Sequence, residues 1–171
     1  MAKPASGILL FLALAVPAWL QSAVADTTAR EVAVSVLPLA SIVEAIGREH
    51  VEVTVMVPPG TSPATFEPTP RQMAGLASSV LYVSVGLPRE RSWLSQIRAI
   101  HPDLPVLDLP AIVETRPIDG RGHATEHERP DPHIWLGPKQ LRTIAKAIRD
   151  ALARIAPGLA PDFEANAREW L

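Results

Sequence analysis

Hydrophobic residues in the first third of the chain alternate between two regular spacings. The β-branched run from Val32 to Val36 predicts a buried strand. The next apolar residues follow one face of a helix: Leu39, Ile42, Val43 and Ile46. The chain then returns to a strand pattern in VEVTVMV, residues 51–57. A strand, a helix and a strand in this short span form a βαβ unit, so we expect parallel strands.

The same alternation continues as far as residue 110. Two more helices and two more strands are predicted, in the order helix from Pro70 after the capping residue Thr69, strand 80–85, helix from Pro88 to about Ile100 and strand 105–110. The whole pattern predicts an α/β fold in which helices flank a parallel sheet.

The second half of the chain contains one irregular segment and two helical patterns. Residues 114–130 have no periodicity and predict a loop, whereas 138–155 carry a continuous apolar stripe and predict a long helix. The opposite face of that helix is basic, through Lys139, Arg142, Lys146 and Arg149. A solvated face is the ordinary interpretation of such cations, and docking of an anionic partner is the alternative.

The two ends of the chain differ from the middle. The first 25 residues combine Lys3, an apolar run from Ile8 to Val16 and the small residues Ala23-Val24-Ala25, which predicts a secretory signal peptide cleaved after Ala25. An uncleaved membrane anchor is the alternative. The final segment, APDFEANAREWL, predicts a further helix without a stop signal, so we expect it to continue in a longer protein.

Composition narrows the possible function classes. The chain of 171 residues has a formal net charge of −2, which gives no reason to expect nucleic acid or an anionic membrane surface as a partner. It contains no cysteine, hence no disulfide and no cysteine for a lipid anchor, although export would permit both. A soluble, monomeric periplasmic protein is the expectation.

Three of the five histidines lie between residues 120 and 135, in GRGHATEHERPDPHIW. Histidine is the commonest metal-ligating side chain, so the cluster raises the hypothesis of a metal site. For His123 and His127 a solvated loop is the simpler interpretation. His133 differs from them because it directly precedes the apolar residues Ile134, Trp135 and Leu136.

Four stretches resemble the solute-binding proteins of the zinc and manganese ABC importers, a family of periplasmic metal receptors. They are VAVSVLPLASIVEAIG, VPPGTSPATFEPTPRQMAGLASSVLYVSVG, the histidine-bearing loop and DPHIWLGPKQLRTIAKAIRDAL. The resemblance covers the mature chain and implies a protein nearly twice as long. The domains expected from it are a signal peptide (1–25), an N-terminal lobe (26–113), a flexible loop (114–130), the end of the lobe (131–160) and the start of an interlobe helix (161–171).

In this family the metal lies between two lobes, which the resemblance implies contribute two ligands each. The histidine of the family motif DPHxW corresponds to His133, which is therefore the principal candidate ligand. The second ligand of this lobe normally follows SP in GxSPHxxEP, where this chain reads GTSPATFEP with Ala64 at the ligand position. Glu67, an oxygen donor in the same turn, is a candidate replacement, and a turn-stabilising role is its alternative.

The resemblance also bears on the choice of metal. A loop rich in histidine and acidic residues is frequent in zinc members, so His123 and His127 favour zinc and imply a weak, exchangeable loop site. Mn²⁺ and Fe²⁺ remain alternatives, because imidazole serves them too in mixed shells with carboxylates.

The function implied is capture of a divalent metal ion and its delivery to the membrane permease of an ABC importer, without catalysis. A secreted zinc-dependent hydrolase is the alternative from another class, and it would require about three protein ligands, an open position and a general base. The chain has no HExxH motif to supply them. A surface adhesin of the same family is a third hypothesis.

Overall fold

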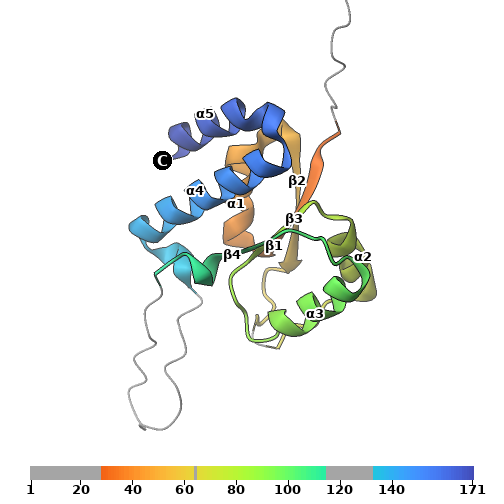
Figure 1. The fold of residues 1–171 in the computed structure, drawn as a ribbon. Coiled ribbons are helices and arrows are strands. Elements are labelled where there is room, and N and C mark those ends of the chain that lie inside the picture. The colour runs from red at the N-terminus through yellow and green to blue at the C-terminus, as the bar shows by residue number, and fades with distance from the viewer. Residues whose placement is uncertain (1–27, 64, 115–132) are drawn as a thin grey trace, which may run out of the picture.

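The computed structural model describes residues 28–63, 65–114 and 133–171 of the chain (Figure 1). The elements in chain order are β1 (Arg30–Val36), α1 (Leu37–Gly47), η2 (Arg48–His50), β2 (Val51–Val57), α2 (Pro70–Ser78), β3 (Leu81–Ser84), α3 (Glu90–Ile100), β4 (Val106–Asp108), η3 (Leu109–Ala111), η4 (Ile134–Leu136), α4 (Pro138–Ile155), η5 (Pro157–Leu159) and α5 (Ala160–Trp170).

The four strands form one parallel sheet in the order β2-β1-β3-β4. The first strand of the chain is therefore central, and its residue Val34 is paired with Val55 of β2 and Val83 of β3. Val34 and Val83 are fully buried and Val55 packs against the same core, which explains why these strands are rich in β-branched residues. The predicted parallel α/β fold is confirmed.

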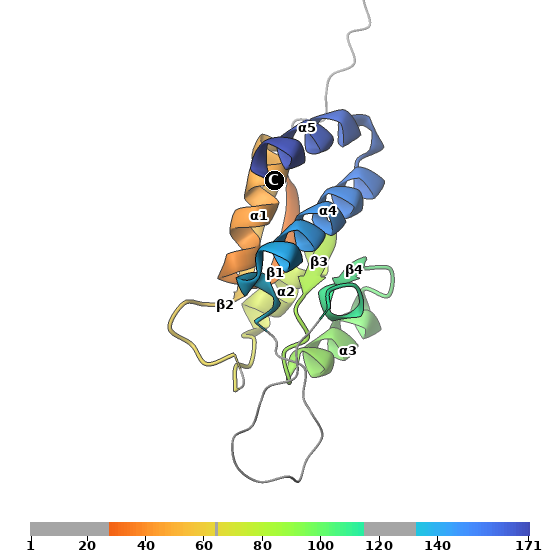
Figure 2. The same ribbon diagram turned by 90° about the vertical axis from the view of Figure 1, so that its left-hand side faces the viewer.

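Helices cover both faces of the sheet. α1, α4 and α5 pack together on one face, and α2 and α3 lie on the other (Figures 1 and 2). The apolar stripe predicted for α1 is fully buried, and the buried residues of α4 are Ile144, Ala145, Ile148, Ala151 and Leu152. Both stripes face the same core, which explains their helical spacing. None of the helices in the described part of the chain is long and apolar enough to cross a membrane.

α2 begins with the cap predicted from Thr69 and Pro70. Thr69 Oγ1 accepts a hydrogen bond from the Gln72 backbone N–H at 3.3 Å, and Gln72 Oε1 accepts one from the Thr69 N–H at 3.0 Å, which makes a capping box. Gln72 Nε2 also donates to the carbonyl of Met56 at 2.8 Å. The start of α2 is thus tied to the end of β2.

α3 begins later than the sequence predicts. The helix starts at Glu90 rather than at Pro88, because Gly86 has a φ of +76° and residues 85–89 form a turn before the helix. The strands 80–85 and 105–110 are likewise shorter in the structure than in the prediction. These differences are confined to element ends, where local pattern carries the least information.

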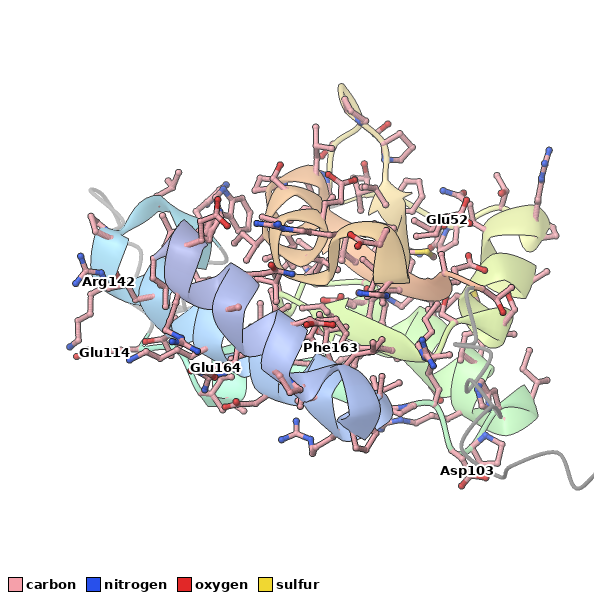
Figure 3. All side chains as sticks on the ribbon, turned by 90° about the horizontal axis from the view of Figure 1, so that it is seen from above. Glu52, Asp103, Glu114, Arg142, Phe163 and Glu164 are labelled. Atoms are coloured by element: carbon pink, nitrogen blue, oxygen red, sulfur yellow. The ribbon has the colours of Figure 1, made fainter. Side chains whose placement is uncertain are left out.

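α5 is packed against the rest of the lobe. Its residues Phe163 and Ala167 are each 1% exposed, and Figure 3 shows Phe163 beside α5, on the side that faces the sheet. Asn166 Nδ2 donates to the Ile46 carbonyl at 2.9 Å, and Glu169 forms an ion pair with Arg48. The final helix predicted from the sequence is confirmed over Ala160–Trp170.

The close contact between the end of α1 and the start of β2 gives the first testable prediction. Gly47 has ordinary helical dihedrals, but a Cβ atom there would lie 2.3 Å from Cγ2 of Val51. Because Val51 is β-branched and stiff, Gly47→Ala should lower the free energy of unfolding by about 1–3 kcal/mol. Urea denaturation measures the change.

Gly158→Ala is the matched control. A Cβ at Gly158 meets no atom within 4 Å, so this variant should unfold at the wild-type urea concentration or slightly above it. Equal urea midpoints for Gly47→Ala and Gly158→Ala would show that an added methyl group at position 47 does not clash with Val51 strongly enough to destabilise the fold.

Candidate metal centre

Three connecting segments follow the carboxyl ends of the strands. Residues 58–69 follow β2, 85–89 follow β3 and 109–114 follow β4. Figures 1 and 2 show the 58–69 loop and the segment around η4 at this same end of the sheet. Open α/β sheets bind ligands at the carboxyl ends of their strands, near the point where the strand order reverses, which here lies between β1 and β3.

His133 directly precedes η4 and is exposed. Its ring packs edge to face against Trp135, with the ring centroids 5.4 Å apart and an interplanar angle of 62°. Trp135 in turn packs against the hydrophobic core, and Ile134 between the two residues is buried. The imidazole is thus supported from one side by an aromatic ring that the core holds in place.

Glu67 lies in the loop after β2 and forms an ion pair with Arg89. Its neighbour Phe66 packs edge to face on Trp93 of α3, with 5.5 Å between the ring centroids. The carboxylate of Glu67 therefore already has a cationic partner in the protein. This contact supports the turn-stabilising role for Glu67, and its role as a ligand remains a prediction.

The other candidate residues lie outside the described part of the chain. Ala64, which occupies the family's ligand position, and the two loop histidines His123 and His127 all fall there. Within residues 28–63, 65–114 and 133–171, no three His, Asp or Glu side chains are grouped so that they could hold a metal ion. His133 is therefore not joined by two further candidate ligands from these ranges.

A buried polar network joins the ends of β1 and β3, and the sequence analysis missed it. Glu90, the first residue of α3, is 1% exposed, and its carboxylate accepts hydrogen bonds from the hydroxyls of Ser35 and Tyr82. Its second oxygen accepts the Leu87 backbone N–H at 2.7 Å. Ser35 Oγ also accepts the Val85 N–H at 3.1 Å. One carboxylate therefore fixes the turn 85–89 against two central strands.

Burial raises the pKa of the Tyr82 phenol well above its ordinary value of 10. The adjacent carboxylate of Glu90 adds to this rise, because phenolate would carry a second negative charge and could no longer donate its proton. The neutral phenol is thus the form that the folded chain holds.

The sequence carried only a faint signal for this network. Acidic residues are common in the first turn of exposed helices, so the stretch GLPRERSW gives no local sign that Glu90 is buried. A serine and a tyrosine within otherwise apolar strands were the available hints, since buried hydroxyls need partners.

Comparison with known proteins gives a consistent result. The family model described as "Zinc-uptake complex component A periplasmic" matches residues 32–171. Manganese-binding lipoprotein MntA of Halalkalibacterium halodurans is 29% identical over 133 residues, which cover 78% of this chain and 42% of that protein. Zinc-binding protein AdcA of Streptococcus pyogenes is 25% identical over 138 residues, which cover 70% of this chain and 27% of AdcA.

Solved structures are similar over the same region. The crystal structure of ZnuA has a TM-score of 0.73 and 31% identity, over 84% of this chain and 54% of that chain. A ZnuA deletion mutant with zinc bound has a TM-score of 0.74 and 33% identity over the same shares. The chain thus spans less than half the length of these curated relatives and about half of the solved ZnuA chains.

The raised pKa of Tyr82 predicts a specific pH dependence of stability. Between pH 10 and the raised pKa, the unfolded chain has lost the phenolic proton and the folded chain retains it, so unfolding releases a proton. Stability should be independent of Tyr82 below about pH 10 and fall above it, by up to about 1.4 kcal/mol per pH unit. Urea denaturation between pH 8 and 11.5 measures this.

Tyr82→Phe is the control, because it removes the titrating group. Its free energy of unfolding should therefore lack the fall above about pH 10 that Tyr82 causes. Tyr82 is the chain's only tyrosine, so ultraviolet absorbance of phenolate reports on this residue alone. Phenolate formation near pH 10 in the folded chain would contradict the prediction.

Proposed function

Because the chain belongs to the family of periplasmic zinc-uptake components, we propose that it captures a divalent transition-metal ion and delivers it to the membrane permease of an ABC importer. Zinc is the ion proposed first. The observation that carries the proposal is the family match over residues 32–171, which includes His133 in the motif DPHIW. MntA is named a manganese-binding protein, which keeps Mn²⁺ as an alternative, and Fe²⁺ is a further one.

His133 is the ligand that we propose from this lobe. It directly precedes η4 and is exposed, and its ring packs edge to face against Trp135. A neutral imidazole nitrogen binds zinc at about 2.0–2.1 Å. An exposed ring held by its neighbour can therefore receive an ion from solvent without rearrangement of the core.

One imidazole does not retain zinc for long, so the remaining ligands must come from elsewhere. Structural zinc sites use four ligands, and the described residues do not group three candidates. We propose that a second lobe, corresponding to the part of the relatives that this chain does not span, supplies them. His123 and His127 are proposed as a weak loop site that exchanges metal with solvent.

The proposed function requires that the protein be exported from the cytoplasm. We propose that the first 25 residues are a signal peptide cleaved after Ala25, and that the mature protein acts as a soluble monomer in the periplasm. The hydrolase alternative gains no support from the family match, whose description is of an uptake component.

His133→Ala tests the proposed ligand. Removing the imidazole should weaken zinc binding by the chain by more than about tenfold, because outer-shell partners alone are worth that much in metal sites. Competition with a chromophoric zinc chelator at pH 7.5 measures the affinity. His101→Ala is the control, since His101 follows α3 and belongs to no proposed site. Equal zinc affinity of the wild type and His133→Ala would reject the assignment.

Ala64→His tests whether the loop after β2 faces the same ion. If it does, a second imidazole should strengthen zinc binding by roughly tenfold at pH 7.5 and favour zinc over manganese. Most of the gain should disappear near pH 5.5, because an ordinary imidazole has a pKa of about 6.5 and must be neutral to coordinate. Titrations at both pH values measure it. The gain should also be absent when His133→Ala is combined with it; a gain that survives would place the new ligand at another site.

A further inference from the structure

The loop after β2 has an exposed limb and an anchored limb. Residues 58–63 are all exposed, and Gly60 has a φ of +81° at their turn. Residues 65–69 end in the capping box of α2, which Gln72 ties to β2 through the Met56 carbonyl. The contacts that hold residues Thr65 to Thr69 in place therefore also restrict the position of the turn that carries a ligand in this family.

Two consecutive residues of the anchored limb contact the start of α3: one packs on the first turn of the helix, and the other pairs with the residue that precedes it. Phe66 packs on the ring of Trp93, and Glu67 pairs with Arg89, four residues earlier. Arg89 is the N-cap residue of α3 and has helical dihedrals, so its side chain and that of Trp93, four residues later, lie on the same side of the helix start. Trp93 is 2% exposed, and its indole N–H has no acceptor among the described residues, so packing alone holds its ring.

The backbone that carries Arg89 is itself fixed. Its neighbour Glu90 is bound through its carboxylate to Ser35 of β1, Tyr82 of β3 and the Leu87 N–H. Arg89 therefore extends from a fixed turn at the carboxyl ends of β1 and β3, although its own side chain is half exposed. A cation on a fixed backbone restrains its partner more than one on a mobile loop, because less conformational entropy is lost on pairing.

We propose that Arg89 and Trp93 form a clamp that holds the loop after β2, and that Glu67 is the anion of this clamp rather than a metal ligand. The part of this inference that concerns the metal rests on the proposed function. Arg89 is a positioning residue in this scheme: it acts through Glu67 on the position of the loop.

The first experiment needs no metal. We expect chymotrypsin to cleave after Phe66 only when the loop has left α3. The cleavage rate of the native chain is divided by that of the urea-unfolded chain. This ratio measures how often the clamp opens. Arg89→Gln leaves the loop sequence unchanged and should accelerate this cleavage roughly 1.5-fold to fivefold, the range expected for loss of an exposed ion pair. Mass spectrometry of the fragments identifies the cut.

Two variants make the result specific to the ion pair. Arg91→Gln removes a neighbouring exposed cation that has no ion-pair partner among the described residues, and it should be cleaved at the wild-type rate. The exchange Glu67→Arg with Arg89→Glu should restore the slow, normalised cleavage. Three outcomes would overturn the clamp. The first is cleavage of Arg89→Gln at the wild-type rate. The others are faster cleavage that an equal fall in the free energy of global unfolding explains, and a double exchange variant that is cleaved as fast as Arg89→Gln.

The second experiment separates the two roles of Glu67. Glu67→Gln should leave zinc affinity within about twofold of the wild type, in a chain that loses affinity on His133→Ala. In the Ala64→His background, Arg89→Gln should remove most of the zinc gain, because the new imidazole is no longer held in place. Weakening by Glu67→Gln comparable to that of His133→Ala would make Glu67 a ligand and overturn its assignment to the clamp. If His133→Ala has no effect, the proposed metal function fails, while the cleavage experiment still decides the clamp.

Discussion

The buried carboxylate of Glu90 is the contact on which the carboxyl edge of this lobe depends. It receives hydrogen bonds from a hydroxyl on β1, a hydroxyl on β3 and a backbone N–H in the turn between β3 and α3. A carboxylate with several donors can stay buried, whereas an unsatisfied one would be costly. The three elements are therefore held in one arrangement at the point where the strand order reverses.

This network explains why the candidate site lies at the rim of the sheet rather than between its central strands. The position between the ends of β1 and β3, where open sheets commonly receive ligands, is bridged by the protein's own side chains. Candidate metal ligands are therefore expected on the loops around that position rather than between β1 and β3. The exposed His133 supported by Trp135 and the loop packed on α3 are the features on which the proposed metal site draws.

The sequence predicted the parallel sheet, the apolar faces of α1 and α4, the Thr69 cap and the final helix, because each depends on local periodicity or on capping chemistry. It also singled out His133 by its place between loop and apolar residues. It did not predict the strand order or the pairing of Glu67 with Arg89, since both depend on contacts between distant segments. Burial of Glu90 was hidden for the same reason: nothing near it in the chain distinguishes it from a surface acid.

The central position of β1 has a consequence for how the chain folds. The strand made first pairs with two strands made later, so its apolar residues remain uncovered until β2 and β3 have both arrived. Parallel pairing needs a crossover each time, which raises the sequence separation of contacts and slows folding. The network of Glu90 can form only once β1, β3 and α3 have met, so it too depends on contacts between distant parts of the chain. We therefore expect this chain to fold more slowly than a helical bundle of the same length, because more of its contacts join distant residues.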